Sequence, residues 1–348
     1  MIQEQRQWGF KVPRKSAEVI RRELIQRSNL DESLRPISNE RHVIFPVKSV
    51  DNLPKSEKYH LAECMFILRE IRPNFDKRLI DLLPVKLRGL RPRGFDVIGG
   101  RVAIIQLHDS LTSFSDEIAN ILSEIGFSSI YLRMSSVEGQ YRLRHLRLLQ
   151  GTPIERLIHR ENGVDMVIDL KRAYFNPRLA TEHERIFQMA GSDEKILDMF
   201  TGVGPFALQL AKHRSASVEA WDINPNAIAC LQESIPLNQI KPDRIRAKVG
   251  DAEELAETAD NESFDRVLMN LPGQSVKYIQ AALPVCRKGG LIFYYRFGDT
   301  KYAGKDAIDE FNAITAQYGF EVALIGTHKV RDIAPGKSQF CCEFRRTI

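Results

Sequence analysis

Four polar side chains follow four successive apolar stretches in the second half of the chain. Asp198, Asp222, Asp251 and Asn270 each stand at or just after a segment that reads as a buried strand. Ligands of open α/β sheets bind at the carboxyl ends of the strands, and carboxylates and amides accept hydrogen bonds from hydroxyl and amino groups. Each residue could instead cap a helix or form a turn, but four in register indicate a ligand pocket at this edge.

A glycine turn predicts how such a ligand is held. Ile196–Phe200 reads as a strand and is followed by Gly202 and Gly204, which permit positive φ and a close approach to the main chain. Pro205 then suits the first turn of a helix. Asp222 follows about 20 residues after the first glycine, where an acidic side chain accepts hydrogen bonds from ribose hydroxyls. We therefore expect a ligand with an adenosine-like half.

Two kinds of adenosine-containing cofactor fit this turn. Residues 202–207 formally match G-x-G-x-x-G/A, so a nicotinamide dinucleotide is one alternative, although the glycine pattern alone is weak. Two further features favour a different adenosine-containing cofactor. They are Asp251, placed for an adenine amino group, and Asn270-Leu271-Pro272, which follows the apolar segment Phe264–Met269. Together these features resemble the class I S-adenosylmethionine-dependent methyltransferases.

That resemblance implies an α/β fold: a Rossmann-like domain whose mostly parallel sheet ends in an antiparallel C-terminal hairpin. We expect two small α/β RNA-binding domains to precede it in the chain. It also implies S-adenosylmethionine as cofactor. The residues expected to contact this cofactor are His183, Asp198, Phe200, Thr201, Gly202, Gly204, Asp222, Ile223, Asp251, Ala252, Asn270 and Pro272.

A basic segment lies upstream of the expected cofactor domain. Residues 133–160 contain six arginines against Glu138 and Glu155, whereas the whole chain has a formal net charge of +5. Clustered arginine is typical of surfaces that bind a phosphate backbone, and a solvated basic face is the alternative. The residues expected to contact RNA are Arg133, Arg142, Arg144, Arg147, Arg156, Arg160 and, further along, Arg178.

Composition narrows the class of protein. The 348 residues, 43% of them hydrophobic, suffice for two or three domains with sizeable cores. The sequence has no run of 18 apolar residues and no hydrophobic signal segment at its start, so we expect a soluble, cytoplasmic protein with no membrane partner. The five cysteines lack Cys-x-x-Cys spacing, which predicts neither a disulfide framework nor a metal site. Cys341 and Cys342 are adjacent and should point to opposite faces of a strand.

The pattern of elements suggests three domains, at residues 1–73, 74–170 and 171–348. In the first, apolar spacing predicts a helix over Ser16–Arg27 and a strand over His42–Val47. The second should contain a hairpin that turns at Gly99-Gly100 and a helix that begins at Ser115 and ends at Gly126. The strands expected in this second domain are Phe95–Ile98, Arg101–Leu107, Ile130–Met134 and Val164–Leu170.

Three segments carry a more specific resemblance. Tyr-Phe-Asn-Pro-Arg-Leu-Ala-Thr-Glu at 174–182, Gly-Gln-Tyr-Arg-Leu-Arg at 139–144 and Asn-Leu-Pro at 270–272 resemble the archaeal and eukaryotic tRNA (guanine-37-N1)-methyltransferases, over nearly the whole chain. That family methylates N1 of the guanosine immediately 3′ of the anticodon. The resemblance implies tRNA rather than DNA as partner and a monomeric enzyme. The N-terminal module should touch the outer corner of the tRNA, and the other domains should hold the anticodon stem-loop.

The resemblance also assigns catalytic roles. Guanine N1 carries a proton that a base must remove, and Glu182 matches the general base proposed for the family. Arg142 matches the residue that stabilises negative charge on guanine O6, while Asn270 offers an amide to the guanine edge. From the bare sequence, Glu182 could simply support a helix start and Arg142 could contact phosphate.

One position departs from the family pattern. Many relatives carry an arginine near the cofactor's carboxylate where this chain has His183. A histidine can still donate a hydrogen bond there, but its charge depends on pH. The alternative is a surface histidine with no role.

Two rival functions share this fold. The aminocarboxypropyl transferase of wybutosine synthesis uses the same cofactor on the same tRNA position, and it releases methylthioadenosine instead of S-adenosylhomocysteine. A non-catalytic RNA-binding protein is the second rival, and the presence of both Glu182 and Arg142 beside an intact cofactor loop disfavours it.

Overall fold

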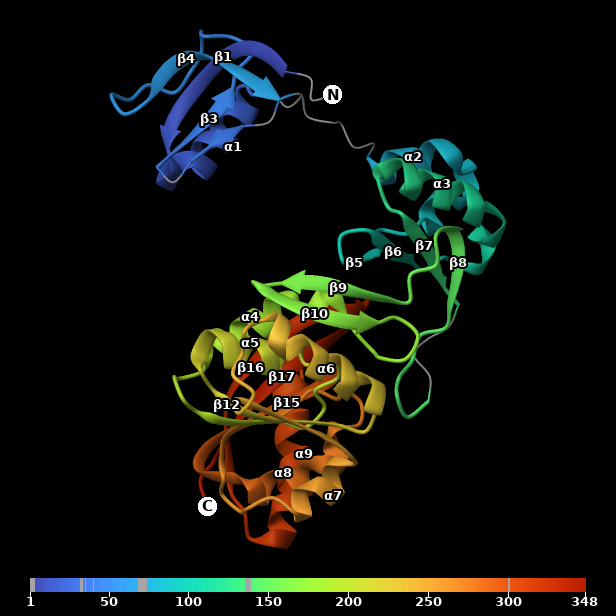
Figure 1. Ribbon diagram of the computed structural model, residues 1–348, viewed down its shortest axis with the longest axis vertical. Helices are drawn as coiled ribbons and strands as arrows, with labels where there is room; N and C mark the ends of the chain where they lie inside the picture. The colour runs from blue at the N-terminus through green and yellow to red at the C-terminus, as the bar shows by residue number, and fades with distance from the viewer. Residues whose placement is uncertain are drawn as a thin grey trace. The chain divides into compact units, whose positions relative to one another are not determined.

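The computed structural model describes residues 4–31, 34, 36–39, 41–67, 74–134, 139–299 and 301–348 (Figure 1). The chain forms two compact units, Met1–Asn74 and Phe75–Ile348. The domain boundary expected near residue 73 falls outside the described residues, and the one expected near residue 170 stays a prediction.

The described residues of the first unit form a four-stranded antiparallel sheet with the α-helix α1 and the short 3-10 helix η1 (Arg14–Ser16). The strand order is β2-β3-β1-β4, and the elements are β1 Glu4–Pro13, α1 Ala17–Gln26, β2 Ile37–Ser38, β3 His42–Pro46 and β4 His60–Ile67. Ile20 and Leu24 of α1 are buried in one cluster with Phe10 and Phe45 of the sheet. The predicted helix and strand are confirmed, whereas β1 and β4 were not expected.

A second four-stranded sheet, of order β5-β6-β7-β8, opens the second unit. Its elements are α2 Phe75–Leu82, η2 Val85–Leu90, β5 Asp96–Ile98, β6 Val102–Ile105, η3 Asp109–Phe114, α3 Ser115–Ile125, β7 Ser129–Arg133 and β8 Leu146–Gly151. The predicted hairpin is confirmed, because Ile98 pairs with Val102 and both turn glycines have positive φ, 57° and 70°. Gly126 ends α3 in the left-handed conformation, also as predicted.

The strands β9 (Arg156–Glu161) and β10 (Val164–Asp169) form a separate hairpin. The hairpin lies between the β5–β8 sheet and the C-terminal part of the chain (Figure 1). The backbone N–H of Asp165 donates to Asn238 (2.9 Å) and that of Val167 to Ser234 (2.9 Å). These bonds attach β10 to the end of α6 (Pro225–Leu237).

The C-terminal part is built on a seven-stranded sheet of order β13-β12-β11-β14-β15-β17-β16. The first five strands in that order are parallel, and β17 is antiparallel to both of its neighbours. The strands are β11 Lys195–Asp198, β12 Ser217–Asp222, β13 Ile245–Val249, β14 Phe264–Met269, β15 Cys286–Asp299, β16 Val322–Ala334 and β17 Lys337–Arg346. The expected methyltransferase-type sheet with its antiparallel C-terminal hairpin is therefore confirmed.

Helices cover both faces of this sheet (Figure 1). They are η4 Pro177–Leu179, α4 Ala180–Met189, α5 Pro205–Arg214 and α6 on one side, and α7 Ala252–Glu257, η5 Ser275–Tyr278, α8 Ile279–Val285 and α9 Ala303–Tyr318 on the other. Successive strand residues alternate between the two cores: Ile196 packs with α5 and α6, whereas Leu197 packs with α8 and α9. Cys341 and Cys342 likewise belong to opposite cores, as predicted.

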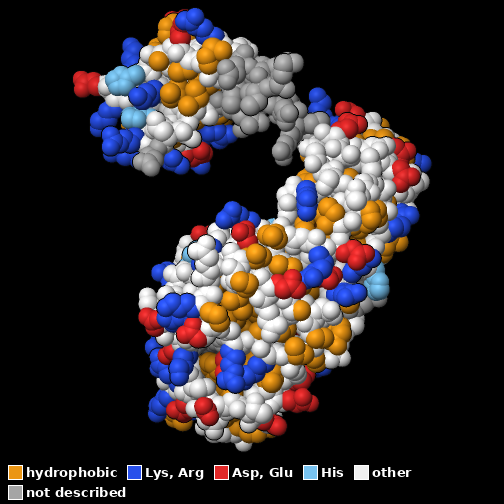
Figure 2. Space-filling view, in the orientation of Figure 1, with side chains coloured by type: hydrophobic (Ala, Val, Ile, Leu, Met, Phe, Trp, Pro, Cys, Tyr) orange, Lys and Arg blue, Asp and Glu red, His pale blue; other side chains and the backbone are white. Residues whose placement is uncertain are grey.

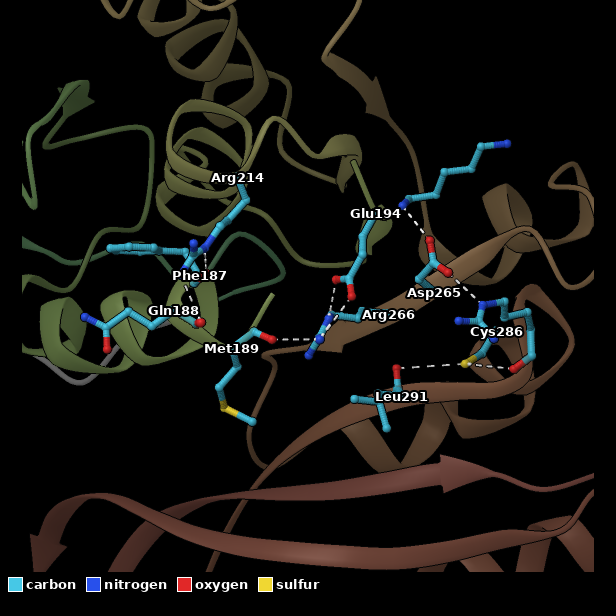
Figure 3. A network of polar contacts seen from close by, with 11 residues as sticks. Phe187, Gln188, Met189, Glu194, Arg214, Asp265, Arg266, Cys286 and Leu291 are labelled. Carbon is cyan, nitrogen blue, oxygen red and sulfur yellow. Dashed lines mark hydrogen bonds and ion pairs between the residues drawn. The ribbon is translucent and has the colours of Figure 1, made fainter. Parts of the chain in front are cut away.

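A polar network ties helix α4 to the amino ends of the strands (Figure 3). Arg266, only 8% exposed, pairs with Glu194 at 2.5 Å and donates to the Met189 carbonyl at 2.8 Å. Asp265 accepts from the Lys195 backbone N–H (2.7 Å) and from Arg287 (2.6 Å). These bonds fix the start of β11 against β14, so the carboxyl ends of both strands are held in register at the opposite edge.

All five cysteines are free thiols. Across the described residues, no helix combines the length and apolar character that crossing a membrane requires.

Candidate functional site

A pocket of about 390 Å³ opens at the carboxyl ends of β11, β12, β13 and β14. Segments after all four strands line it, together with residues from 140–142 and 174–176. The predicted residues that it brings together are Arg142, His183, Phe200, Thr201, Gly202, Asp222, Ile223, Asp251, Ala252 and Asn270. Of the residues predicted to be catalytic or to bind the cofactor, Glu182, Asp198, Gly204 and Pro272 do not line it.

The glycine turn is rigidly tied to β12. The Thr201 backbone N–H donates to the Trp221 carbonyl (2.8 Å), and the Gly202 N–H donates to Asp222 Oδ2 (2.7 Å). Gly202 and Gly204 have φ of 56° and 84°, where a residue with a Cβ is strained. A Cβ on Gly204 would also lie 2.3 Å from Leu231 of α6. Gly204 therefore serves helix packing, while Gly202 lies at the pocket wall.

Asp222 combines a structural role with an open acceptor. Its Oδ2 holds Gly202, and its Oδ1 accepts from the Asn224 backbone N–H at 2.8 Å. Burial raises the pKa of Asp222, and these two backbone donors oppose the rise. Because each carboxylate oxygen has a second lone pair, Asp222 can fix the turn and still accept ribose hydroxyls.

Asp251 caps helix α7 and also faces the pocket. Its Oδ1 accepts from the Glu253 backbone N–H at 2.9 Å, so the helix-cap interpretation is correct for this residue. Tyr278 lies nearby, and burial together with the charges of Asp251 and Glu253 raises the pKa of its phenol. The Tyr278 ring meets Phe200 edge-on at 4.9 Å. Phe200 and Tyr278 thus supply an aromatic wall next to a carboxylate, which suits a planar base with an amino group.

Asp198 lies in the core and not at the pocket. It is fully buried, and neither carboxylate oxygen has a hydrogen-bond partner of good geometry. Burial, reinforced by the charge of Asp222, raises the pKa of Asp198 to about 7, and polar groups of Thr201 and Phe200 oppose the rise only in part.

A second group of side chains approaches the pocket from the middle of the chain. The guanidinium carbons of Arg142 and Arg144 lie 5.7 and 5.4 Å from the centre of the Tyr174 ring, within cation–π range. Arg144 is 8% exposed and pairs with Asp96 at 3.1 Å, whereas Arg142 lines the pocket. Arg142 has a φ of 52° and follows a turn in which its N–H donates to the Gly139 carbonyl (3.1 Å).

Asn270 is oriented by the C-terminal hairpin. Gln339 of β17, 1% exposed, donates from Nε2 to Asn270 Oδ1 at 3.5 Å and accepts from Arg331 Nε at 2.9 Å. In this orientation the Asn270 Nδ2 donor is left for a ligand. Burial lowers the pKa of Arg331, and the nearby cations Arg178 and Arg144 lower it further.

Glu182 lies on the sheet side of α4, in a dense polar network. Its carboxylate receives two bonds from Arg185 at 2.8 Å and one from the Tyr295 hydroxyl at 2.6 Å. His328 Nε2 is 3.7 Å from Oε2. Glu182 is 3% exposed, so these groups surround the carboxylate that the sequence suggested as a base.

His183 is buried beside the pocket and not exposed on the surface. Its Nδ1 lies 2.6 Å from Glu161 Oε1, and both side chains are nearly inaccessible, at 2% and 4%. The ring meets Phe206 edge-on at 4.6 Å. The interpretation of His183 as a surface residue without contacts is therefore wrong.

The predicted RNA-binding arginines differ in environment. Arg147, Arg156, Arg160 and Arg178 are all exposed. Three of them have carboxylate partners: Arg156 pairs with Glu233 (2.8 Å), Arg160 with Asp165 (3.4 Å) and Arg178 with Asp96 (2.6 Å). Burial lowers the pKa of Arg133. On the face of the second unit drawn in Figure 2, basic side chains lie among acidic ones. Arg144, Arg156, Arg160 and Arg178 each have a carboxylate partner, so RNA phosphates would have to compete with these carboxylates.

Sequence reasoning missed several residues of the site. Tyr278, Gln339, Glu161 and Tyr295 all contact predicted residues, but each does so through tertiary contacts between distant elements. Of these four, only Tyr278 could have been found from the sequence, because it is an aromatic residue shortly after the predicted site residue Asn270. Within the described part of the chain, no group of three or more His, Cys, Asp or Glu side chains could hold a metal ion.

Comparison with known proteins gives consistent matches along the chain. Residues 157–323 match the TRM5/TYW2 methyltransferase domain, residues 9–52 the tRNA methyltransferase 5 N-terminal domain, and residues 75–154 the TYW2 N-terminal domain. The chain is 34% identical to the tRNA (guanine(37)-N(1))-methyltransferase Trm5b of Pyrococcus abyssi, over 97% of this chain and 98% of that protein. The crystal structure of Trm5b from Pyrococcus abyssi superposes with a TM-score of 0.71 at 32% identity, over 98% of this chain and 100% of the other.

Two further similarities bear on the choice between functions. A solved complex of aTrm5 with tRNALeu superposes with a TM-score of 0.69 at 28% identity, over 98% of this chain and 99% of the other. The tRNA(Phe) (4-demethylwyosine(37)-C(7)) aminocarboxypropyltransferase of Pyrococcus horikoshii is 29% identical, over 76% of this chain and 94% of that enzyme. Because the match to Trm5b of Pyrococcus abyssi extends over nearly the full length of both chains, this protein belongs to the TRM5/TYW2 methyltransferase family.

Proposed function

We propose that this protein transfers a methyl group from S-adenosylmethionine to N1 of guanosine 37 in tRNA. The observation that carries the proposal is a single pocket whose wall combines the nucleoside-type acceptors Asp222 and Asp251 with Arg142 and Asn270. The first pair suits an adenosine, and the second pair can donate to the polar edge of a second base. The relative from Pyrococcus abyssi carries the corresponding name.

The cofactor end of the pocket fits an adenosine-containing sulfonium. Asp222 would accept the ribose hydroxyls, and Asp251 would accept the adenine amino group beside Phe200 and Tyr278. S-adenosylmethionine supplies a methyl group already activated on a sulfonium. Gly202 has no side chain, so the cofactor can approach the main chain there. Its positive φ would strain any residue with a Cβ.

At the guanine end, Arg142 and Asn270 act as fixed donors. Loss of the N1 proton moves negative charge onto O6, and a guanidinium held in place would stabilise that charge as it develops. Stacking against Tyr174 restrains the Arg142 guanidinium. Asn270, oriented through Gln339, presents its amide to the base edge.

Glu182 is the proposed general base. Arg185 and the Tyr295 hydroxyl donate to its carboxylate and hold it in one orientation. Glu182 lies outside the pocket lining in this structure, so the role requires its side chain or the first turn of α4 to move toward the target base when tRNA binds. Catalytic hydrogen bonds often form only in the substrate complex.

The proposal extends to the domains. Residues 171–348 carry the chemistry, residues 74–170 hold the anticodon stem-loop, and residues 1–73 touch the outer corner of the tRNA. The enzyme works as a monomer in the cytoplasm. Arg147 and Arg160, the more open of the predicted arginines, are the first candidates for phosphate contacts.

Aminocarboxypropyl transfer is the second candidate, because residues 75–154 match the TYW2 N-terminal domain. One experiment separates the two functions. Unmodified tRNA and, separately, tRNA that carries 4-demethylwyosine at position 37 are incubated with enzyme and methyl-labelled S-adenosylmethionine, and the nucleosides and the spent cofactor are identified by mass spectrometry. We expect labelled N1-methylguanosine and S-adenosylhomocysteine. Unlabelled RNA together with methylthioadenosine would establish the rival reaction.

A further inference from the structure

A carboxylate of the β5–β8 sheet joins two arginines that come from different segments around the pocket. Asp96, the first residue of β5, accepts from Arg144 Nη1 at 3.1 Å and from Arg178 Nε at 2.6 Å. Arg144 follows Arg142 by two residues, and Arg178 lies in η4, directly before helix α4. Asp96 therefore links β5 to the two segments that carry the proposed catalytic side chains Arg142 and Glu182.

Arg144 is enclosed, which makes it poorly placed for an RNA phosphate. Its side chain is 8% exposed, and that of Asp96 is 11% exposed. The Arg144 guanidinium lies 5.4 Å from the centre of the Tyr174 ring, and its Nε is buried without a hydrogen-bond partner. A buried guanidinium is costly unless a carboxylate is paired with it. Asp96 supplies that carboxylate.

The same carboxylate offsets repulsion in a wider group of arginines. Burial lowers the pKa of Arg133, at the end of β7, and of Arg331 on β16. The charges of Arg144 and Arg178 lower both pKa values further, whereas the charge of Asp96 raises them. Four guanidiniums thus share the field of Asp96, and without its charge they would repel one another.

The Tyr174 ring carries this restraint to the pocket. Tyr174 and Arg142 both line the pocket, and the Arg142 guanidinium carbon lies 5.7 Å from the centre of the ring. A guanidinium within about 6 Å of a ring centre is attracted to the ring, so Arg142 and Arg144 are restrained against the same side chain. A displaced Arg144 would move Tyr174, and Arg142 would move with it.

We propose that Asp96 is a positioning residue of the methyl transfer: through Arg144 and the Tyr174 ring, it holds the Arg142 guanidinium where guanine O6 would lie. The inference rests on the proposed function, since it takes guanine as the base that Arg142 meets. Asp96 itself touches no reacting atom.

The pair with Arg178 adds a consequence for RNA binding. The Arg178 side chain is 58% exposed, and a phosphate that approaches it must displace the Asp96 carboxylate. Loss of the Asp96 charge should therefore slow the chemical step and strengthen the binding of tRNA. A residue with a merely structural role would not give these opposite signs, because a disordered site weakens both.

The test measures single-turnover methylation of unmodified tRNA at saturating tRNA, and tRNA affinity at fixed salt, with the full-length protein. Asp96→Asn keeps the shape of the side chain and removes its charge. We expect the chemical step to slow by about 10–10²-fold, the usual cost of misplacing a catalytic group. We expect tRNA affinity to rise by about two- to fivefold, the strength of one exposed ion pair.

Asp76→Asn is the matched control. It makes the same chemical change in the same unit, where Asp76 pairs with Arg91 at 2.6 Å and does not line the pocket. Its rate and its tRNA affinity should equal those of the parent. A parental single-turnover rate in Asp96→Asn would overturn the inference, and so would a rate and an affinity that both fall.

The Arg142→Lys background tests the route through Arg142. Because the contact that Asp96 positions is already lost there, adding Asp96→Asn should slow the rate by less than about twofold. A loss in the double variant equal to the product of the two single losses would contradict the proposal.

The variant Asp96→Asn/Arg144→Gln covers the case in which Asp96→Asn does not fold. It removes both charges of the buried pair, so neither is left alone. It should be slow by the same 10–10²-fold range, and a parental rate would overturn the inference. A folded parent that forms no N1-methylguanosine would instead refute the proposed function.

Discussion

Glu182→Gln tests the general base, and the structure predicts two separate effects of the change. The carboxylate receives two bonds from Arg185 at 2.8 Å and one from Tyr295 at 2.6 Å. Glutamine keeps the shape but presents an amide group to donors that need an acceptor. The variant should therefore lose stability as well as basicity, and each loss has to be measured by itself.

The contacts of Glu182 set the expected loss of stability, and the usual contribution of a general base sets the expected loss of rate. Breaking a buried ion pair costs up to about 3–5 kcal/mol, but Arg185 keeps a second partner, Glu343, at 2.5 Å. We therefore expect the free energy of unfolding to fall by about 2–3 kcal/mol, nearer the value of one hydrogen bond to a charged group. Loss of a general base slows the chemical step by about 10²–10⁴-fold, which corresponds to about 2.7–5.4 kcal/mol of activation free energy.

Glu343→Gln supplies the matched control, because it weakens the same Arg185 network and leaves the Glu182 carboxylate in place. Both variants should show similar losses in urea unfolding. In single-turnover methylation with saturating tRNA, only Glu182→Gln should be slow. Equal single-turnover rates for the two variants would refute the general-base role, and Glu182 would then be a structural ligand of Arg185.

Three further predictions concern binding and the transition state. Asp222→Ala should weaken S-adenosylhomocysteine binding by about 1–3 kcal/mol in calorimetry, because a ribose acceptor and the anchor of Gly202 are both lost. Burial raises the pKa of Asp222, so the parent's affinity for adenosine should fall as pH decreases through that raised pKa. An unchanged affinity of Asp222→Ala for S-adenosylhomocysteine would count against the ribose role. Arg142→Lys should depress the single-turnover rate with little change in tRNA affinity if the contact is to guanine O6, because lysine lacks the planar fork; a loss confined to affinity would indicate a phosphate contact. Affinity for tRNA should fall steeply with salt, and Arg160→Ala should flatten the slope by about one unit, whereas an unchanged slope would mean that Arg160 contacts no phosphate.

Elements with strong local signals could be predicted from the sequence. The strand–glycine–helix unit at β11 and α5 was predictable because its hydrophobic run, its glycines and Pro205 all act within a few residues. The turn at Gly99-Gly100 was predictable for the same reason, since both residues adopt positive φ. In contrast, β1 and β4 pair with each other across more than 40 residues, and their polar faces hide the alternation. Their existence depends on tertiary pairing that a local pattern does not encode.

In the site, the positions of residues along the chain were predictable, but the directions of their side chains were not. Strand ends could be located, so the positions of Asp222, Asp251 and Asn270 at one edge of the sheet are confirmed. The direction of a side chain could not be inferred in the same way. Asp198 ends its strand as expected but points into the core. Glu161 and Gln339 lacked any local signal, because their roles arise from contacts of β9 with α4 and of β17 with the end of β14.

The first turn of α4 links the cofactor pocket to the buried Glu182 network. Successive residues of a helix point about 100° apart, so Glu182 faces β15 while His183 faces the pocket. Immediately before this turn, Arg178 in η4 pairs with Asp96 of β5 at 2.6 Å. A tRNA phosphate that binds Arg178 must compete with Asp96, which retains Arg144 as a partner at 3.1 Å. Such an exchange would loosen η4 from β5 and leave the start of α4 free to turn. Because Glu182 and His183 share that turn, we expect RNA binding at Arg178 to reorient the proposed base and the proposed cofactor contact together.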